Sequence, residues 1–330
     1  MKRLKAVSAA AALCACSMTA GAQTMEDAIS IANTQLANSQ LAYRIAYAEY
    51  LTLGESAELG REVFAKDVGN KQLGADFVPG DPRRIWNSIL WSGLVGPTDI
   101  STGVDDVDVT QNLSAGNTLQ PGEDLAAFHT VNGTWDAVEC SDIDLVDIGD
   151  SGGFDAGVVQ ASFGFGGSFE VPVDIAHAGM VPPAFFDAFA CGAPGSGCGN
   201  NILGVAFTFI WLDEAGNPTD VDRNRKLDVA FREIYYNDRH PWQDNPNDQL
   251  GDGAIDLESV ALHEMGHGLS QAHFGTVAAV DRNRDGFVQL DEIQVSPQAV
   301  MNAIHTVAGR TVEGTDLGGH CSNWGQWPRK

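Results

Sequence analysis

The sequence predicts an α+β domain, and three observations carry that prediction. Candidate strands and helices are interspersed along the chain, and long helices are few. Residues 202–212, ILGVAFTFIWL, form a continuous apolar run that is typical of a buried central strand. Residues 255–270, IDLESVALHEMGHGLS, show the clearest helical pattern in the chain. The 330 residues suffice for one large domain or two modest ones with a proper core.

The first 22 residues are typical of a secretory signal peptide. Basic residues precede a short apolar segment, and the small-residue triplet AGA ends at Ala22, before the expected cut. The apolar segment is too short to span a bilayer. We therefore expect export, either to the periplasm or to the extracellular space. A lipid anchor at Cys16 is the less favoured alternative.

The segment 23–84 is expected to be helical in its first part. Apolar residues recur at helical spacing over 25–53, and no Gly or Pro occurs there before Gly54. Gly and Pro residues then become frequent, and we place an approximate domain boundary near Arg84. Three roles stay open for this segment: a pro-segment, a docking helix, or part of the main fold.

Residues 85–330 are expected to form the main domain. Apolar runs and alternation indicate its strands, and amphipathic spacing indicates its helices. Strands are expected over 84–95, 141–148, 157–167, 169–179, 202–212 and 228–238, and helices over 122–138 and 255–270.

The stretch HEMGHGLSQAH, from His263 to His273, predicts a catalytic zinc site. On a helix, His263 and His267 lie on one face and can converge on one metal ion. Glu264 is the next residue round the helix, where it can polarise a metal-bound water. With His273 as third ligand, the fourth position stays open for water, as in catalytic sites. A rival class of zinc site would take a distant third carboxylate, for which Glu292 is a candidate.

The stretch DRNRDGFVQLDE, residues 281–292, matches the spacing of a calcium-binding loop. Hard oxygen ligands at these positions wrap a cation of the size of calcium, and Gly286 stands at the sharp turn. The alternative is a solvated acidic turn. The expected ligands are Asp281, Asn283, Asp285, the carbonyl of Phe287, Gln289 and Glu292. A partial copy with Asp220, Asp222, Asn224 and Asp228 lacks the glycine, and a turn between strands is favoured there.

Cysteine usage and charge bound the function classes further. Cys140, Cys191, Cys198 and Cys321 follow the signal segment, and an even count in an exported chain suggests two disulfides. Cys191 and Cys198 flank a short Gly-rich loop and form the natural pair, which leaves Cys140 with Cys321. Four free thiols are the alternative. The net charge of −25 disfavours a nucleic-acid partner.

The zinc motif, followed by Met301 in the stretch SPQAVMNAI, resembles the metzincin metallopeptidases, and the matrixin branch most closely. The stretches VDIAHAGMVPP and IYYNDRHPW add weaker similarity. The resemblance spans about residues 85–310. It implies a twisted mixed sheet, a long helix that carries the zinc motif, and a Met-turn with Met301 beneath the zinc. It also implies that a peptide lies along an edge strand, expected near residues 173–180.

The chain departs from the family pattern at three places. Family members usually have Gly where Ser270 stands, so Ser270 must accept the turn toward His273. His177 matches a ligand of the family's second, structural zinc, but Tyr236 or a neighbour replaces a later histidine. We therefore interpret His177 as a structural histidine. The cysteine that blocks the zinc in matrixin pro-segments has no counterpart between Gln23 and Glu139.

The sequence thus predicts a secreted zinc endopeptidase that acts on protein or peptide substrates, with no membrane span. Glu264 is the expected general base. Two alternatives remain at this stage: a calcium-dependent binding or adhesion module whose zinc is structural, and a zinc hydrolase that acts on other bonds. The oligomeric state and the bond specificity have no readable signal in the sequence.

Overall fold

The computed structural model describes residues 25–53, 123–141, 157–171, 173–221, 223–244, 254–279, 282–284 and 292–325, with short pieces between 66 and 151. The expected signal peptide, residues 1–22, lies outside the described residues. So do four expected calcium ligands, Asp281, Asp285, Phe287 and Gln289.

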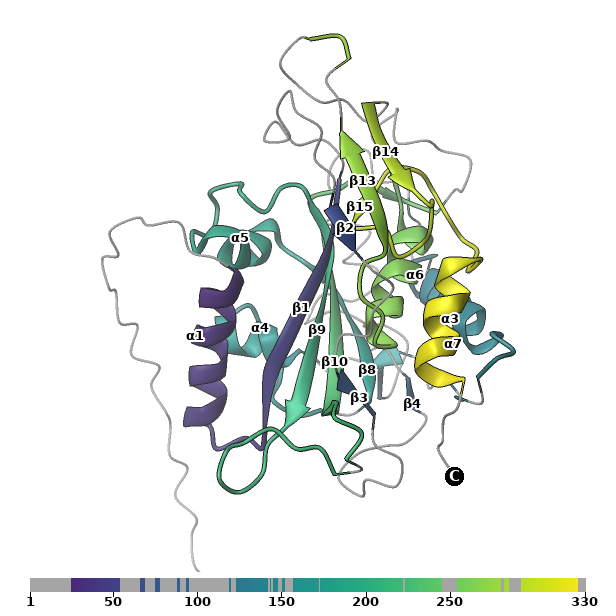
Figure 1. Ribbon diagram of the computed structural model, residues 1–330. Helices are drawn as coiled ribbons and strands as arrows, with labels where there is room; N and C mark the ends of the chain where they lie inside the picture. Colours follow the sequence, from purple (N-terminus) through teal and green to yellow (C-terminus); the bar gives the residue numbers. More distant parts are fainter. Residues whose placement is uncertain are drawn as a thin grey trace, which may run out of the picture.

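A mixed sheet runs through the centre of the molecule, with helices on both faces (Figure 1). Strand β10 (Leu227–Asn237) pairs parallel with β8 (Ile175–Val181) and antiparallel with β9 (Ile202–Trp211). The spatial order is β15 (Ile304–His305), β1 (Tyr43–Leu53), β9, β10, β8, β4 (Ser88–Ile89) and β6 (Val146–Asp147), and β3 (Ala75–Asp76) also pairs with β10. The predicted α+β class with a mixed sheet is confirmed.

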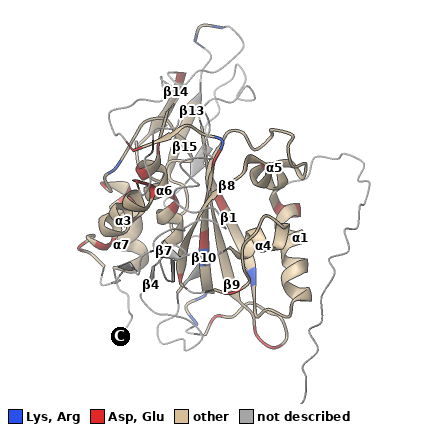
Figure 2. Cartoon of the chain, turned by 180° about the vertical axis from the view of Figure 1, so that it is seen from behind, with Lys and Arg blue, Asp and Glu red and all other residues tan. Residues whose placement is uncertain are grey.

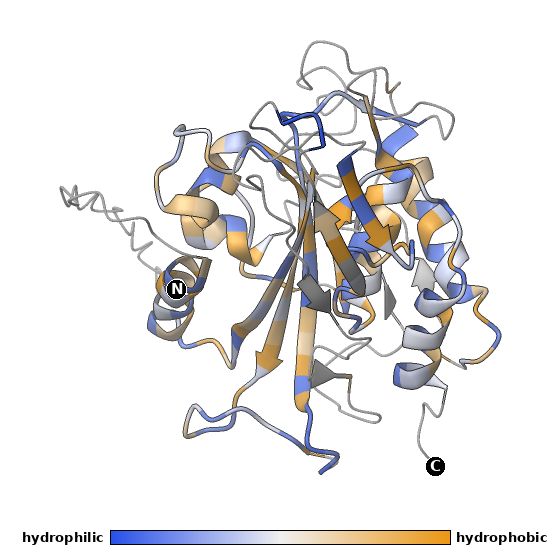
Figure 3. Cartoon of the chain, turned by 45° about the horizontal axis from the view of Figure 1, so that its top comes forward, coloured by the Kyte–Doolittle hydropathy of each residue, from blue (hydrophilic) through white to orange (hydrophobic). Residues whose placement is uncertain are grey.

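Two hydrophobic cores lie on opposite faces of this sheet. One contains buried residues of α1 (Met25–Asn38), α4 (Val158–Phe163) and α5 (Pro183–Cys191). The other contains buried residues of α3 (Glu123–Asp136), α6 (Leu257–Gly268) and α7 (Thr315–Trp324). Apolar residues accordingly concentrate along the central strands and on the inward sides of the helices (Figure 3).

Short strands complete the architecture. They form small separate sheets, β13 (Gly275–Ala279) with β14 (Ile293–Ser296) and β2 (Lys66–Val68), β11 (Trp242–Gln243) with β12 (Ile255–Asp256), and β5 (Gly93–Leu94) with β7 (Asp150–Ser151).

Helix α6 is held at the centre of its core from both ends. The Asp256 side chain caps its start by accepting the Ser259 backbone N–H at 3.1 Å. Two buried indoles, from Trp135 and Trp324, donate to the carbonyls of Leu262 and Leu269 at 3.0 and 2.8 Å. Every residue of the helix is buried, so packing on all sides fixes its position and its rotation relative to the sheet.

The prediction of one helix over residues 25–53 is correct only for its first half. Helix α1 ends at Asn38, and Gln40 takes a positive φ of 57°. The chain then forms β1, whose residues pair with β9 from Tyr43 to Thr52. The alanines and the apolar spacing fit a helix locally, but pairing with the apolar strand β9 satisfies the backbone and buries Ile45 and Leu51.

The strand expected over residues 157–167 is wrong, because this stretch forms helix α4. A carboxylate from another element accounts for the difference. Glu233 on β10 accepts the backbone N–H groups of Val158 and Val159 at 2.7 and 3.1 Å. These groups have no partner within a helix, and the carboxylate of a distant strand caps them.

The other long elements are close to their predicted bounds. Helix α3, β9, β10 and α6 lie where the sequence predicts them. In 84–95 and 141–148 the structure describes only the short strands β4, β5 and β6. Helices α5 and α7 were not expected; α5 begins with Pro183 in its first turn and is followed by Gly192 at φ 66°.

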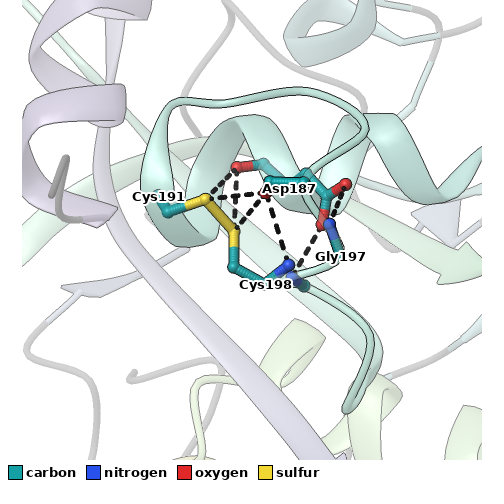
Figure 4. The surroundings of a disulfide bond; sticks show 6 residues. Asp187, Cys191, Gly197 and Cys198 are labelled. Carbon is teal, nitrogen blue, oxygen red and sulfur yellow. Dashed lines mark hydrogen bonds between the residues drawn. A yellow bond between two sulfur atoms is a disulfide. The ribbon is translucent and has the colours of Figure 1, made fainter. Parts of the chain in front are cut away.

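The structure contains both predicted disulfides. Cys140 joins Cys321, with a Cα–Cα distance of 5.6 Å, and Cys191 joins Cys198 at 6.4 Å. The buried Asp187 carboxylate organises the loop of the second bridge by accepting the N–H groups of Gly197 and Gly199 at 3.0 and 2.8 Å (Figure 4). Two disulfides indicate folding in an oxidising compartment outside the cytoplasm.

Acidic side chains outnumber basic ones across the fold, as Figure 2 shows. No helix in the described part of the chain is long and apolar enough to cross a membrane.

Candidate metal site

Three buried histidines converge at one end of helix α6. His263 and His267 lie one turn apart, and the chain that leaves the helix brings His273 to them. The Nε2 atom of His267 is 3.0 Å from Nε2 of His263 and 3.2 Å from Nε2 of His273. Ligand atoms around a tetrahedral zinc ion are about 3.3 Å apart, given Zn–N bonds of about 2.0–2.1 Å. The cluster therefore fits a zinc ion, and it is the one such group of His, Cys, Asp or Glu among the described residues.

Each histidine is oriented by a partner on its other ring nitrogen. Nδ1 of His263 lies 2.6 Å from the carbonyl oxygen of Val300, and Nδ1 of His267 lies 2.7 Å from that of Gln271. Nδ1 of His273 lies 3.4 Å from the Glu49 carboxylate. A proton on Nδ1 leaves Nε2 as the lone-pair donor, which is the arrangement that supports a metal ligand.

The turn to His273 depends on Ser270, which adopts a positive φ of 67°. This left-handed conformation raises the backbone energy of any residue that has a Cβ, and a hydrogen bond in the site offsets that cost. The buried Arg232 guanidinium donates to Ser270 Oγ at 2.8 Å and to the Gly268 carbonyl at 2.7 Å. Ser270 thus accepts the turn for which the resembling family uses glycine.

Burial keeps His263 and His267 neutral in the metal-free protein. Desolvation lowers the pKa of His267 to about 4 and holds the pKa of His263 well below its usual value. A neutral imidazole is the form that ligates metal. The site therefore needs little proton release from its histidines to accept a cation.

Glu264 lies beside the cluster and is also fully buried. Burial raises the pKa of its carboxyl well above the usual value, and the backbone N–H of Leu51 on β1 partly opposes that rise. A Cβ at Gly204 on β9 would come within 2.8 Å of Glu264 Oε1. Glycine at position 204 therefore makes room for this carboxylate between the sheet and the helix.

Met301 lies in a turn on the other side of α6. Its side chain occupies the space that a Cβ at Gly266 would need, next to His267. The Asp316 carboxylate accepts the N–H groups of Val300 and Met301 at 2.9 and 3.1 Å. The turn that places Met301 also presents the carbonyl that orients His263.

A cavity of about 410 Å³ adjoins His263 of the cluster. Its walls come from β1, the start of α6, and the segment from Pro297 to Asp316. Leu51, His263, Val300, Ile304 and His305 are among the residues that line it. A partly open space of this size beside a metal site can accept a side chain of a substrate.

Residues of the expected calcium loop are described only in part. Glu292 is buried, and its Oε1 accepts the backbone N–H groups of Arg282 and Asn283 at 2.7 and 3.1 Å. The last expected ligand is therefore turned toward the start of the loop. Glu292 does not belong to the histidine cluster, so its candidacy as third zinc ligand receives no support.

The edge strand was expected near residues 173–180, and this expectation is wrong. Strand β8 lies between β10 and β4, and all seven of its residues are buried. The side of the sheet nearest the histidines is formed by β9 and β1. His177, on β8, is buried against Tyr236, whose hydroxyl lies 2.7 Å from Nδ1, in agreement with a structural role.

Sequence reasoning missed Glu49, Leu51 and Arg232. Glu49 and Leu51 fell inside an expected helix, far in sequence from the zinc motif. Arg232 lay in a correctly predicted strand, but nothing in the sequence pairs it with Ser270. Recognition of residues 43–53 as a strand would have been the one way to connect Glu49 and Leu51 with the zinc motif.

Comparison with known proteins adds no family. No family model matches the chain, and no curated protein gives a significant match.

Proposed function

We propose that the chain is a secreted zinc-dependent endopeptidase that uses Glu264 as general base. The observation that carries this proposal is the meeting of three histidine Nε2 atoms with a buried carboxylate that is not part of the cluster. A structural three-histidine site has no need of Glu264. The resemblance to metzincins, which rests on these same residues and Met301, supports peptides as the substrate class.

The chain's residues divide the work of hydrolysis. When bound, zinc supplies a water of lowered pKa and polarises the scissile carbonyl. His263, His267 and His273 would hold the ion, and their Nδ1 partners keep the three rings oriented. Glu264 takes a proton from the attacking water and delivers it to the departing nitrogen. Burial between the helix and the sheet shields this carboxylate from bulk water, which suits a group that takes up and returns one proton.

The 281–292 loop is proposed to bind calcium. The ligand spacing supports this proposal, and the buried Glu292 carboxylate folds back onto the loop's first residues. Calcium would neutralise the acidic residues gathered there. The loop connects β13 to β14, between His273 and Met301, so a bound ion would steady both ends of the site.

A structural zinc site in a calcium-dependent binding module is the second candidate. The low exposure of the cluster favours it, because His263, His267 and His273 are only 1, 0 and 6% exposed. A catalytic ion must be reached by substrate. The two candidates therefore differ in whether something movable covers the histidines.

Replacement of Glu264 by Gln separates the two candidates. We expect the variant to keep about one zinc per chain and to lose hydrolysis of a mixed peptide library. Glu258→Gln is the matched control, since Glu258 is a buried carboxylate on the same helix that pairs with Arg310 at 2.8 Å. Metal content and mass spectrometry of the library give both readouts. Retention of hydrolysis in Glu264→Gln would refute the mechanism.

A further inference from the structure

Strand β1 occupies the space in which a peptide would bind beside the histidines. It pairs antiparallel with β9 on one side and, through Thr52 and Leu53, parallel with β15 on the other. In β-addition, an extended peptide joins the edge of a sheet through main-chain hydrogen bonds, and β1 lies against β9 in this way. The N-terminal segment of this chain thus sits as a bound peptide would.

The register of β1 brings one peptide bond to the site. Leu51 pairs with Gly204, the residue against which the Glu264 carboxylate rests. The Leu51 side chain lines the 410 Å³ cavity together with His263, the residue that precedes Glu264. Two residues earlier on the strand, Glu49 contacts His273. The bond between Tyr50 and Leu51 is therefore flanked by the candidate metal ligands and the candidate base.

We propose that the Tyr50–Leu51 bond is the first substrate of this enzyme and that the chain cleaves it in cis. The inference rests on the proposed endopeptidase function. Water adds across the amide: its hydroxyl joins the carbonyl carbon of Tyr50, which becomes a carboxylate. Glu264 passes the proton to the nitrogen of Leu51, which leaves as a new amino terminus. Leu51 occupies the cavity as the residue after the cut.

Cleavage also explains why the histidines are covered. Leu51 and Glu49 close the site in the intact chain, and cutting between Tyr50 and Leu51 leaves two new chain ends that can move away from the histidines. Tyr43 and Ile45 still pack in the core on the opposite face, together with α1. After the cut, residues up to Tyr50 are therefore a separate chain that only non-covalent contacts hold on the core.

The experiment uses the chain from Gln23 onward, prepared without metal and then given zinc. Samples are quenched in acid and analysed by intact mass and N-terminal sequencing under denaturing, non-reducing conditions. No cysteine lies between Gln23 and Tyr50, so the fragment separates without reduction. We expect a new amino terminus at Leu51, formed at a rate that does not change over about tenfold dilution. Glu264→Gln should bind zinc and stay intact.

Leu51→Ala tests the cavity, with Ile45→Ala as its matched control. Both side chains lie on β1, are 2% exposed and lose the same kind of aliphatic volume. Removal of a side chain from a recognition pocket costs about 10–200-fold in rate per methylene. We therefore expect Leu51→Ala to slow the cut at least about tenfold, while Ile45→Ala leaves it within about twofold. Equal slowing in both variants would show that strand stability, and not the cavity, governs cleavage.

Four outcomes overturn the inference. A cut at another bond, or a Leu51 terminus in Glu264→Gln, refutes cleavage at this site by this base. An intact chain that hydrolyses the peptide library refutes self-cleavage and leaves the endopeptidase proposal standing, with β1 as a permanent wall of the site. An intact chain that binds zinc and hydrolyses no peptide refutes self-cleavage; if a chain cut after Tyr50 by an added protease also hydrolyses no peptide, the endopeptidase proposal is refuted as well.

Discussion

Ser270 should show how the turn toward His273 is stabilised. Ser270→Ala keeps the positive φ and removes the hydroxyl that accepts from Arg232. Loss of a hydrogen bond to a charged group costs about 1.5–3 kcal/mol. Ser270→Gly loses the same bond but relieves a backbone penalty of about 1–2 kcal/mol. We expect Ala to destabilise the protein by about 1.5–3 kcal/mol and Gly by about 1–2 kcal/mol less than Ala.

Urea denaturation of the metal-free chain measures these differences, carried out in the Glu264→Gln background so that self-cleavage does not intervene. Zinc titration of the same samples reports whether His273 still reaches the cluster. The Ala variant should bind zinc more weakly than the Gly variant, because glycine preserves the turn. Equal stability of the two variants would refute the argument, since the positive φ would then carry no penalty.

Three further predictions follow from the site and its surroundings. In the uncut chain, Glu49→Gln should weaken zinc affinity about 10–100-fold without abolishing binding, because it weakens the charge that orients His273; an unchanged affinity in a chelator competition would contradict this role. Calcium should raise the melting temperature, and Glu292→Gln should need more calcium for the same shift; a melting temperature that ignores calcium would mean that the loop is only an acidic turn. Burial lowers the pKa of His177 to about 3, so the unfolded chain takes up a proton below about pH 6.5 that the folded chain refuses. Through that histidine, the free energy of unfolding should therefore fall by about 1.4 kcal/mol per pH unit as the pH drops from about 6.5 toward 3. His177→Gln should reduce by that amount the dependence of the unfolding free energy on pH, measured by urea denaturation at several pH values. If that pH dependence is unchanged, His177 is not protonated differently in the folded and unfolded states.

The elements with a strong local signal were predictable from the sequence. The run ILGVAFTFIWL is buried on both faces, so its continuous apolarity is what the fold requires. The zinc motif encodes its own geometry, because the spacing of His263 and His267 and the helix that carries them are both local. The need for an unusual conformation at Ser270 was visible as well, since the chain must reverse between two ligands.

The remaining features depend on contacts between distant parts of the chain. Residues 157–167 become a helix because the Glu233 carboxylate, more than sixty residues later, caps the N–H groups at its start. Residues 43–53 fit a helix in isolation and form a strand because β9 offers its edge. The contact between Glu49 and His273 follows from that pairing alone. In both cases the element that packs against the segment, and not its local propensity, determines the secondary structure.

The disulfide between Cys140 and Cys321 makes the support of the histidine site depend on an oxidising environment. It closes a loop of 181 residues that contains both histidine-bearing segments and the turn of Met301. In the chain-entropy view such a loop destabilises the unfolded state by about 5 kcal/mol. The bridge links the end of α3 to α7, the two helices whose tryptophans hold α6, so reduced protein should lose the support of the histidine helix first. Because Cys321 follows every residue of the site, this bridge can close only after all of those residues have been synthesised. The hydrolysis proposed above would then begin only once the protein has also met an oxidant.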